Sequence, residues 1–232
     1  MKHFNLAAVF FAACITPLQT VTAADSDNAI WGIVSTSDKI RRAGTDTRWR
    51  YSIATQWRNF DRGNGADQYL LRSSMGYDVK PGMTLWAGFD YFQTDPDGGS
   101  KRFERRYWQQ FSWAARRFDW GSLAFRWRFE QRDLENSRDT GLRFRQQAQL
   151  AFPLEKSDMT AIVSMEHFAN LNDTDAGARS GFDQLRSYAG LRLPLNKKAS
   201  LEGGYMHQFV NRATGVDAVN HTLMLHLRVR FR

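Results

Sequence analysis

The chain has 232 residues, which suits one domain or one domain preceded by a short leader. It carries 32 Lys and Arg against 24 Asp and Glu, and arginine outnumbers lysine by 25 to 7. Aromatic residues make up 14% of the chain, yet the mean hydropathy is −0.54. The single cysteine is Cys14. Its loss with a leader would exclude disulfides, cysteine-based zinc sites and thiol catalysis.

The first segment has the features of a secretory signal peptide. Lys2 and His3 supply a basic start, residues 4–15 are apolar except for Asn5, and small residues follow at 21–24. The apolar run is too short to span a bilayer, which takes about 20 residues. We predict that residues 1–24 are removed, which leaves 25–232 with 31 basic and 24 acidic residues. A lipid anchor on Cys14 is the alternative.

Alternation with a period of two follows the leader and indicates strands. Residues 29–40 form a possible first strand. The clearest alternation then comes, in chain order, at residues 47–58, 121–132, 142–150, 185–193 and 222–231. In residues 47–58, for example, Trp49 and Trp57 share one face while Arg48 and Arg58 share the other.

These segments predict a transmembrane antiparallel β-barrel of about 10–12 strands. They run for about 10 to 15 residues, which suits tilted membrane strands. No helical pattern is available to cover their apolar faces, and an open sheet edge is not tolerated in lipid. Ten strands run from residue 47 to the end, and residues 29–40 make a possible eleventh. Since bacterial barrels have even strand numbers, either a twelfth strand escapes the pattern or the first segment lies outside a closed ten.

The connections alternate in length, and aromatic residues lie near the segment ends. Both features are typical of outer-membrane barrels, in which aromatic girdles mark the two interfaces. Short connections are expected at 78–83, 117–121, 153–158 and 194–198, and long polar ones at 61–67, 93–101, 133–139, 170–181 and 211–219. The last strand carries a penultimate aromatic, Phe231. We therefore place the chain in the outer membrane of a Gram-negative bacterium, with the short connections in the periplasm.

Several segments carry a family resemblance. They are LWAGFDYF (85–92), RYWQQ (106–110), FRWRFEQR (125–132), GLRFR (141–145), GFDQLR (181–186), LEGGYMHQ (201–208) and NH (220–221). Taken together, the chain from residue 29 onward resembles the barrel family known as domain of unknown function 2490. The resemblance implies an outer-membrane barrel and no established activity, so no functional residue is carried over. A more distant, architectural likeness is to small oligogalacturonate and sialic-acid porins.

The inward faces of the predicted strands carry a set of arginines drawn from distant parts of the chain. Closure of the barrel would gather them around one lumen. The set comprises Arg48, Arg50, Arg58, Arg72, Arg106, Arg126, Arg128, Arg143, Arg145, Arg186, Arg192, Arg228 and Arg230. Guanidinium groups stay charged and fit carboxylates in a planar fork. A ring of them concentrates anions and excludes cations. The leading hypothesis is a passive channel for small anionic solutes, with acidic sugars as the candidate class.

The same faces carry five acids, which supports a second hypothesis. The acids are Asp90, Glu104, Glu130, Glu166 and Glu202. Arginine–carboxylate networks could fill the interior and leave a closed structural barrel. Thirteen arginines exceed five acids, however, and an unpaired buried charge costs several kcal/mol. This surplus favours water or anions inside the barrel.

An outer-membrane lipid-modifying hydrolase is the third hypothesis. Four histidines survive maturation: His167, His207, His221 and His226. Ser164, Glu166 and His167 are close in sequence, and His207 and His221 are expected near the outer rim. None of these residues forms a recognisable nucleophile–base motif, so we expect no enzymatic activity.

Other classes of ligand have weaker support. Asp173, Asp175 and Gly177 resemble half of a calcium loop, but Gln184 stands where a bidentate glutamate is needed. We therefore expect no metal and no cofactor. Nucleic acid is not expected either, because a stacking groove needs arginines and aromatics on one face. The expected partners are outer-membrane lipid and lipopolysaccharide, the barrel-insertion machinery and small anionic solutes.

Overall fold

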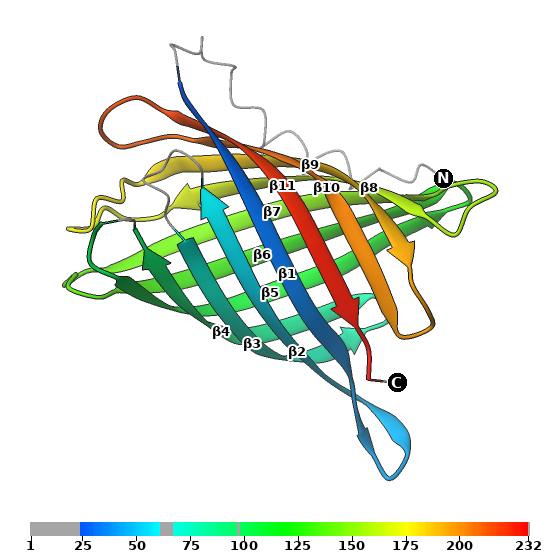
Figure 1. Ribbon diagram of the computed structural model, residues 1–232. Coiled ribbons are helices and arrows are strands. Elements are labelled where there is room, and N and C mark those ends of the chain that lie inside the picture. The colour runs from blue at the N-terminus through cyan, green and yellow to red at the C-terminus, as the bar shows by residue number, and fades with distance from the viewer. Residues whose placement is uncertain (1–23, 61–66, 97, 232) are drawn as a thin grey trace, which may run out of the picture.

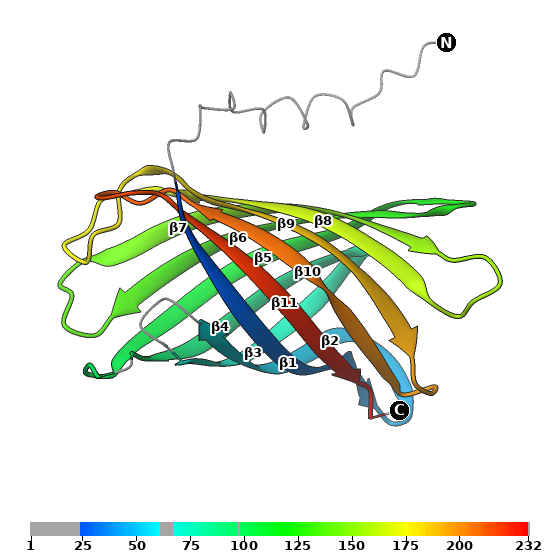
Figure 2. The same ribbon diagram turned by 45° about the horizontal axis from the view of Figure 1, so that its top comes forward.

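The structure, a computed structural model, describes residues 24–60, 67–96 and 98–231. Within these ranges the chain forms eleven strands that close into one barrel (Figures 1 and 2). They are β1 (Asp25–Arg42), β2 (Thr45–Phe60), β3 (Asp67–Lys80), β4 (Met83–Asp95), β5 (Arg102–Phe118), β6 (Gly121–Leu134), β7 (Thr140–Pro153), β8 (Thr160–Asn170), β9 (Gly181–Pro194), β10 (Ala199–Val210) and β11 (Ala218–Val229). The predicted all-β barrel is confirmed. The predicted leader lies outside the described residues except for Ala24.

The barrel closes by pairing its first and last strands in parallel. Each strand otherwise pairs antiparallel with the next along the chain. β1 and β11 stay in register from Asp25 opposite Ala218 to Thr36 opposite Val229. Both alternatives predicted for the strand number are therefore wrong. The first segment belongs to the wall, and a parallel seam lets an odd number of strands close.

The connections define two different ends of the barrel. Residues 43–44, 81–82, 119–120, 154–159 and 195–198 join strands at one end, called here the short-turn end. Residues 61–66, 96–101, 135–139, 171–180 and 211–217 join strands at the other, the long-loop end. The predicted alternation of loop lengths is confirmed. Because the strand number is odd, β1 starts at the long-loop end and β11 finishes at the short-turn end (Figure 1).

The turn between β1 and β2 was absent from the sequence prediction. Ala43 and Gly44 have φ angles of 48° and 79°. Two consecutive residues with positive φ match the twist of a two-residue hairpin. β1 runs for 18 residues before it reaches this turn. No helix in the described ranges is long and apolar enough to cross a membrane.

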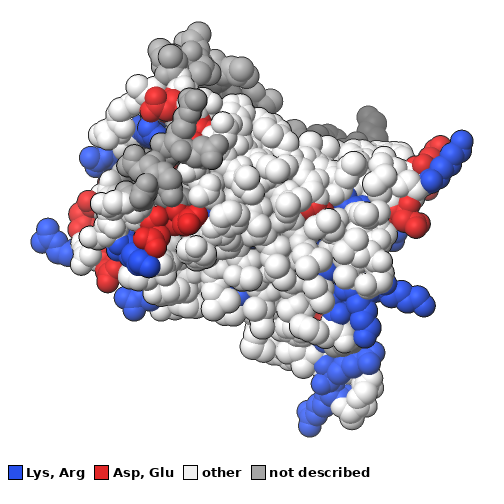
Figure 3. Space-filling view, in the orientation of Figure 1, with Lys and Arg blue, Asp and Glu red and all other residues white. Residues whose placement is uncertain are grey.

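The outer face of the wall is apolar between two charged ends. Lys, Arg, Asp and Glu gather mainly at the ends, and the wall between them is mostly uncharged (Figure 3). Large apolar side chains are exposed along the wall, including Ile53, Leu71 and Leu223. Aromatic pairs flank this band. Trp49 packs edge-on against Tyr77 near the short-turn end, with ring centroids 5.0 Å apart.

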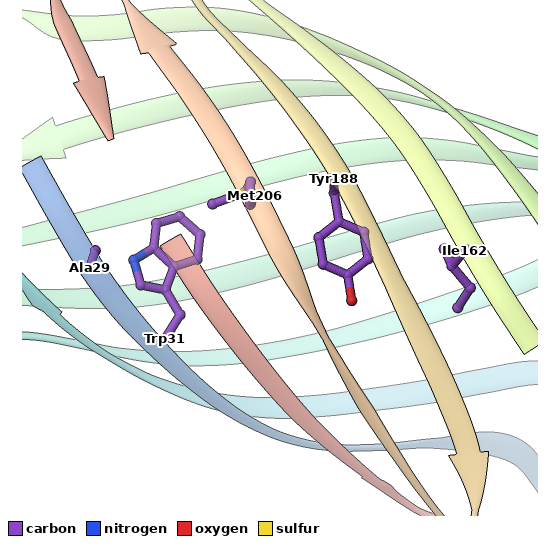
Figure 4. Close-up of a cluster of buried hydrophobic side chains, with 5 residues drawn as sticks. All are labelled: Ala29, Trp31, Ile162, Tyr188 and Met206. Carbon is purple, nitrogen blue, oxygen red and sulfur yellow. The ribbon is translucent and has the colours of Figure 1, made fainter. Parts of the chain in front are cut away.

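The inner face contains an apolar cluster on one side of the barrel. Trp31, Ile162, Tyr188 and Met206 are buried there together with Ala29 (Figure 4). They come from β1, β8, β9 and β10. Charged side chains share the inner face of these strands, among them Glu166 on β8, Arg186 on β9 and Glu202 on β10.

Candidate functional site

Charged side chains inside the barrel form the candidate site. Nine of the thirteen predicted arginines have a carboxylate within ion-pair distance. These nine are Arg50, Arg72, Arg106, Arg126, Arg128, Arg143, Arg145, Arg192 and Arg228. Their strands, from β2 to β11, meet only because the wall closes. The structure therefore brings together residues that are up to 178 positions apart in sequence.

Glu130 is the centre of this network. Its side chain is fully buried and faces three arginines. Its oxygens lie 2.6 Å from Arg145 Nη1, 2.7 Å from Arg143 Nη2 and 3.6 Å from Arg128 Nη1. One carboxylate thus offsets part of the charge of three guanidinium groups.

Asp90 is the second fully buried acid. Arg72 donates two hydrogen bonds to it, of 2.8 and 2.7 Å, in the planar fork that guanidinium groups favour. The indole N–H of Trp108 donates a third, of 2.7 Å. The Arg128 guanidinium lies 3.8 Å from the centroid of the same Trp108 ring. The ring therefore links the two acidic centres.

The three remaining predicted acids each join two arginines. Glu104 pairs with Arg106 and Arg132, Glu166 with Arg126 and Arg145, and Glu202 with Arg192 and Arg228. All three carboxylates are buried. Because each carboxylate pairs with more than one arginine, a small number of acids is enough for many arginines inside the barrel.

Sequence reasoning missed three members of the network. Asp78 pairs with Arg50 at 2.8 Å, and Asp183 approaches Arg143 at 3.4 Å. Arg132 pairs with Glu104 at 2.5 Å. Arg132 is two residues after Glu130 on β6, so alternation predicts that both side chains lie on the inner face. Asp78 and Asp183 lie near strand ends, where alternation is a weaker guide.

Four predicted arginines have no carboxylate partner among the described residues. Arg48 donates to the backbone carbonyls of Asp78 and Val79 at the short-turn end. Arg230 follows the last residue of β11 and is exposed. Its backbone N–H still donates to the Lys198 carbonyl, at 2.7 Å.

Arg58 and Arg186 are the other two, and both lie inside the barrel. Arg58 donates to the amide oxygens of Gln56 and Gln68, at 3.1 and 3.5 Å. Arg186 donates to the amide oxygen of Gln184, at 3.1 Å. Both guanidinium groups lie over the ring of Trp31, at 4.0 and 5.1 Å from its centroid. Neutral amides and aromatic faces replace carboxylates at this place.

The interior contains two hollows, one at each end. The short-turn hollow has a volume of about 930 Å³ and is lined by residues that include Lys39, Arg48, Arg50 and Arg126. The long-loop hollow has a volume of about 330 Å³ and is lined by Arg58, Arg186 and four further arginines. The two hollows share no lining residue in the described part of the chain.

A septum of buried side chains separates the hollows. Its buried members, which line neither hollow, are Asp90, Trp108, Arg128, Glu130, Arg145, Glu166 and Phe168, and the partly exposed Arg72 lies beside them. The order of inward residues along β6 shows the arrangement. Arg132 lines the long-loop hollow, Glu130 and Arg128 belong to the septum, and Arg126 lines the short-turn hollow.

Interior aromatics are the main feature that the sequence prediction did not contain. Trp31, Trp108 and Phe168 are at most 3% exposed, and each lies under at least two guanidinium groups. A signal for them existed. Trp108 has the same parity as Glu104 and Arg106, so it shares their inward face.

The predicted hydrolase residues are divided between the two faces of the wall. Glu166 is buried in the septum, whereas His167 packs on the outer face against Phe182, with ring centroids 5.4 Å apart. The Tyr205 hydroxyl and His221 Nδ1 form a hydrogen bond of 2.5 Å. The ring centroids of His221 and His207 lie 5.8 Å apart.

His226 has a partner that the sequence did not suggest. Ser35 Oγ lies 2.7 Å from His226 Nε2, across the parallel seam between β1 and β11. The pair resembles a nucleophile and its base in distance alone. Neither residue lines one of the two hollows, so we assign the contact to the seam.

The acidic residues of the calcium-like segment hold two long loops together. Asp175 accepts hydrogen bonds from the Ser137 hydroxyl at 2.5 Å and the Arg138 N–H at 3.0 Å. These bonds lower the pKa of the Asp175 carboxyl. The Ser180 N–H likewise lowers the pKa of Asp173, at 2.7 Å. In the described residues, no group of three or more His, Cys, Asp or Glu is arranged to hold a metal ion.

Comparison with known proteins agrees with this architecture. A family described as "Protein of unknown function (DUF2490)" matches residues 28–220. An uncharacterised protein of Methylorubrum extorquens is 37% identical over 175 residues, which cover 73% of this chain and 76% of that protein. No solved structure matches the chain significantly. The chain belongs to the DUF2490 family.

Proposed function

We propose that the protein is an outer-membrane barrel of a Gram-negative bacterium that lets small anions pass along its interior arginines. Its closed wall leaves no unpaired strand edge, as hydrocarbon requires. Its apolar outer face suits contact with lipid and, at the long-loop end, with lipopolysaccharide. In this proposal the long loops face outward, a signal peptide directs export and the barrel-insertion machinery assembles the wall.

The observation that carries anion passage is the charge balance inside the wall. Every interior carboxylate named above is already paired. Two interior arginines, Arg58 and Arg186, have no carboxylate within ion-pair distance among the described residues. Both line a hollow. A low-dielectric wall around a cationic hollow raises the local concentration of anions. The proposed mechanism is electrostatic selection, without covalent chemistry or a cofactor.

The septum must take part in passage. Arg128 and Arg126 follow each other along the inner face of β6, from the septum to the short-turn hollow. A passing anion could replace a carboxylate as the partner of each guanidinium in turn. Passage then requires small displacements of arginine side chains, not of the wall.

A closed structural barrel is the second candidate, and the septum favours it. Asp90 and Glu130 are 0% exposed, and Trp108 is 2% exposed. If these side chains keep their positions, they fill the space that they occupy between the two hollows. This candidate predicts a stable barrel without conductance.

Planar-bilayer recording separates the two candidates. Refolded wild-type protein in a salt gradient should give an anion-selective reversal potential. Exchanging both Arg126→Ala and Arg128→Ala should shift that potential toward cation selectivity. Arg212→Ala is the matched control, because Arg212 pairs with Asp25 on the exposed surface. Heat-modifiable electrophoretic mobility checks that each variant is folded. Folded wild-type protein without conductance would support the closed barrel instead.

A further inference from the structure

The long-loop hollow contains polar groups that the protein itself does not satisfy. Among the described residues, the Trp31 indole N–H, the Arg58 Nε–H and the Gln208 amide oxygen are buried without a hydrogen-bond partner. All three residues line this hollow. A buried polar group without a partner destabilises the folded state. Three of them around one hollow indicate a binding site.

The donors among these groups require an anionic ligand. Arg58 and Arg186 approach the same Trp31 ring from β2 and β9, and in the described part of the chain neither has a carboxylate within ion-pair distance. Two guanidinium groups near each other repel, and a carboxylate between them would relieve the repulsion. Guanidinium groups bind carboxylates through two parallel hydrogen bonds. Arg106, Arg132 and Arg143, which also line the hollow, are less available because each is already paired with a carboxylate.

The acceptor among these groups requires a hydroxyl on the same ligand. Gln208 donates through Nε2 to Gln184 at 2.7 Å, which leaves its amide oxygen facing no donor. An O–H or N–H donor satisfies this oxygen, and a ligand hydroxyl in the hollow supplies one. A volume of about 330 Å³ lies at the lower end of small-molecule sites. The ligand is therefore small.

We infer that the long-loop hollow binds a small hydroxylated carboxylate, held by Arg58 and Arg186 at its charged end and by Gln208 at a hydroxyl. The site lies on the route of the proposed function and deepens it, because a bound ligand would wait there before it reaches the septum. Trp31 supplies a flat surface and an additional N–H donor.

The experiment uses full-length protein refolded in detergent and three probes of similar length. D-gluconate has the carboxylate and hydroxyls, hexanoate has only the carboxylate, and sorbitol has only hydroxyls. Titration calorimetry should detect gluconate, hexanoate at least about tenfold more weakly, and no sorbitol binding. Loss of one hydrogen bond to a charged group changes affinity by about tenfold or more.

Variants then locate the site. Arg58→Gln and Arg186→Gln should each weaken gluconate binding by about tenfold or more. Gln208→Met should weaken gluconate binding and leave hexanoate unchanged. Arg212→Gln is the control, because Arg212 lies outside this hollow and pairs with Asp25 on the exposed surface. If Arg58→Gln does not fold, Arg58→Lys tests the same donor with the charge retained.

The results separate this inference from the proposed function. Binding of gluconate with the expected variant effects, in a protein that does not conduct, supports the site and rejects the channel. Anion-selective conductance without gluconate binding overturns the site and keeps the channel. Equal effects of Arg58→Gln and Arg212→Gln, or equal affinity for hexanoate and gluconate, would also overturn the inference.

Discussion

Replacing Glu130 by glutamine should destabilise the barrel strongly, because it removes the most buried charge of the septum. The exchange keeps the shape and one acceptor oxygen but leaves Arg128, Arg143 and Arg145 facing a neutral group. Removing one partner of a buried ion pair costs about 3–5 kcal/mol. Arg143 keeps Asp183 at 3.4 Å, and Arg145 keeps Glu166 at 2.7 Å. We therefore expect the lower end of that range, about 3 kcal/mol.

The assay is urea unfolding of protein folded into lipid vesicles, followed by tryptophan fluorescence. Asp25→Asn is the control, because the Asp25–Arg212 pair is solvent-exposed and such pairs contribute about 0–1 kcal/mol. The same Glu130→Gln protein should show a larger anion conductance in bilayers, since the septum loses the carboxylate that holds its arginines. A Glu130→Gln barrel as stable as the Asp25→Asn control would refute the account of the septum.

Three further changes probe the wall and the loops. In Gly88→Ala, the new Cβ would lie 2.6 Å from Cη2 of the Trp108 ring. We therefore expect the free energy of unfolding, measured in urea, to fall by about 1–3 kcal/mol. Gly32→Ala is the control and should unfold like wild type, because its Cβ has no neighbour closer than 3.7 Å. Ser35→Ala should lower stability by about 1 kcal/mol through the lost seam hydrogen bond, and an unchanged urea midpoint would show that this bond is dispensable. The lowered pKa of Asp175 means that its loop contacts are complete above the ordinary aspartate value of about 3.9 and are lost as the pH falls through the lower folded value. The amide chemical shift of residue 138 should report that transition, and Asp175→Asn should abolish it.

Alternation predicted the wall of the barrel well, because the period of two is imposed by the backbone and by the contrast between its two faces. Residues 47–58 show this directly. Trp49, Ile53 and Trp57 are exposed on the outer face, as predicted, while Gln56 is buried. The loop alternation followed from the same segmentation. The pairing of each arginine with its acid did not follow, because it depends on register between strands.

The strand number could not be read from the sequence for a physical reason. An antiparallel hairpin leaves a turn signal between its strands, whereas the seam between β1 and β11 joins residues at opposite ends of the chain. β1 also alternates weakly, since Ser35 and Thr36 stand where one polar and one apolar residue would mark the faces. Its inclusion in the wall depends on closure, which is a property of the whole sheet.

The aromatic side chains inside the barrel change how the surplus of arginine should be interpreted. The surplus of arginines over acids in the sequence predicts water or anions beside the unpaired arginines. Trp31, Trp108 and Phe168 instead cover guanidinium groups, and such stacking contributes about 0.5–2 kcal/mol per contact. A ring has no net charge, so it stabilises the arginine without cancelling its field. A tightly filled septum and an interior that attracts anions are therefore compatible in one barrel.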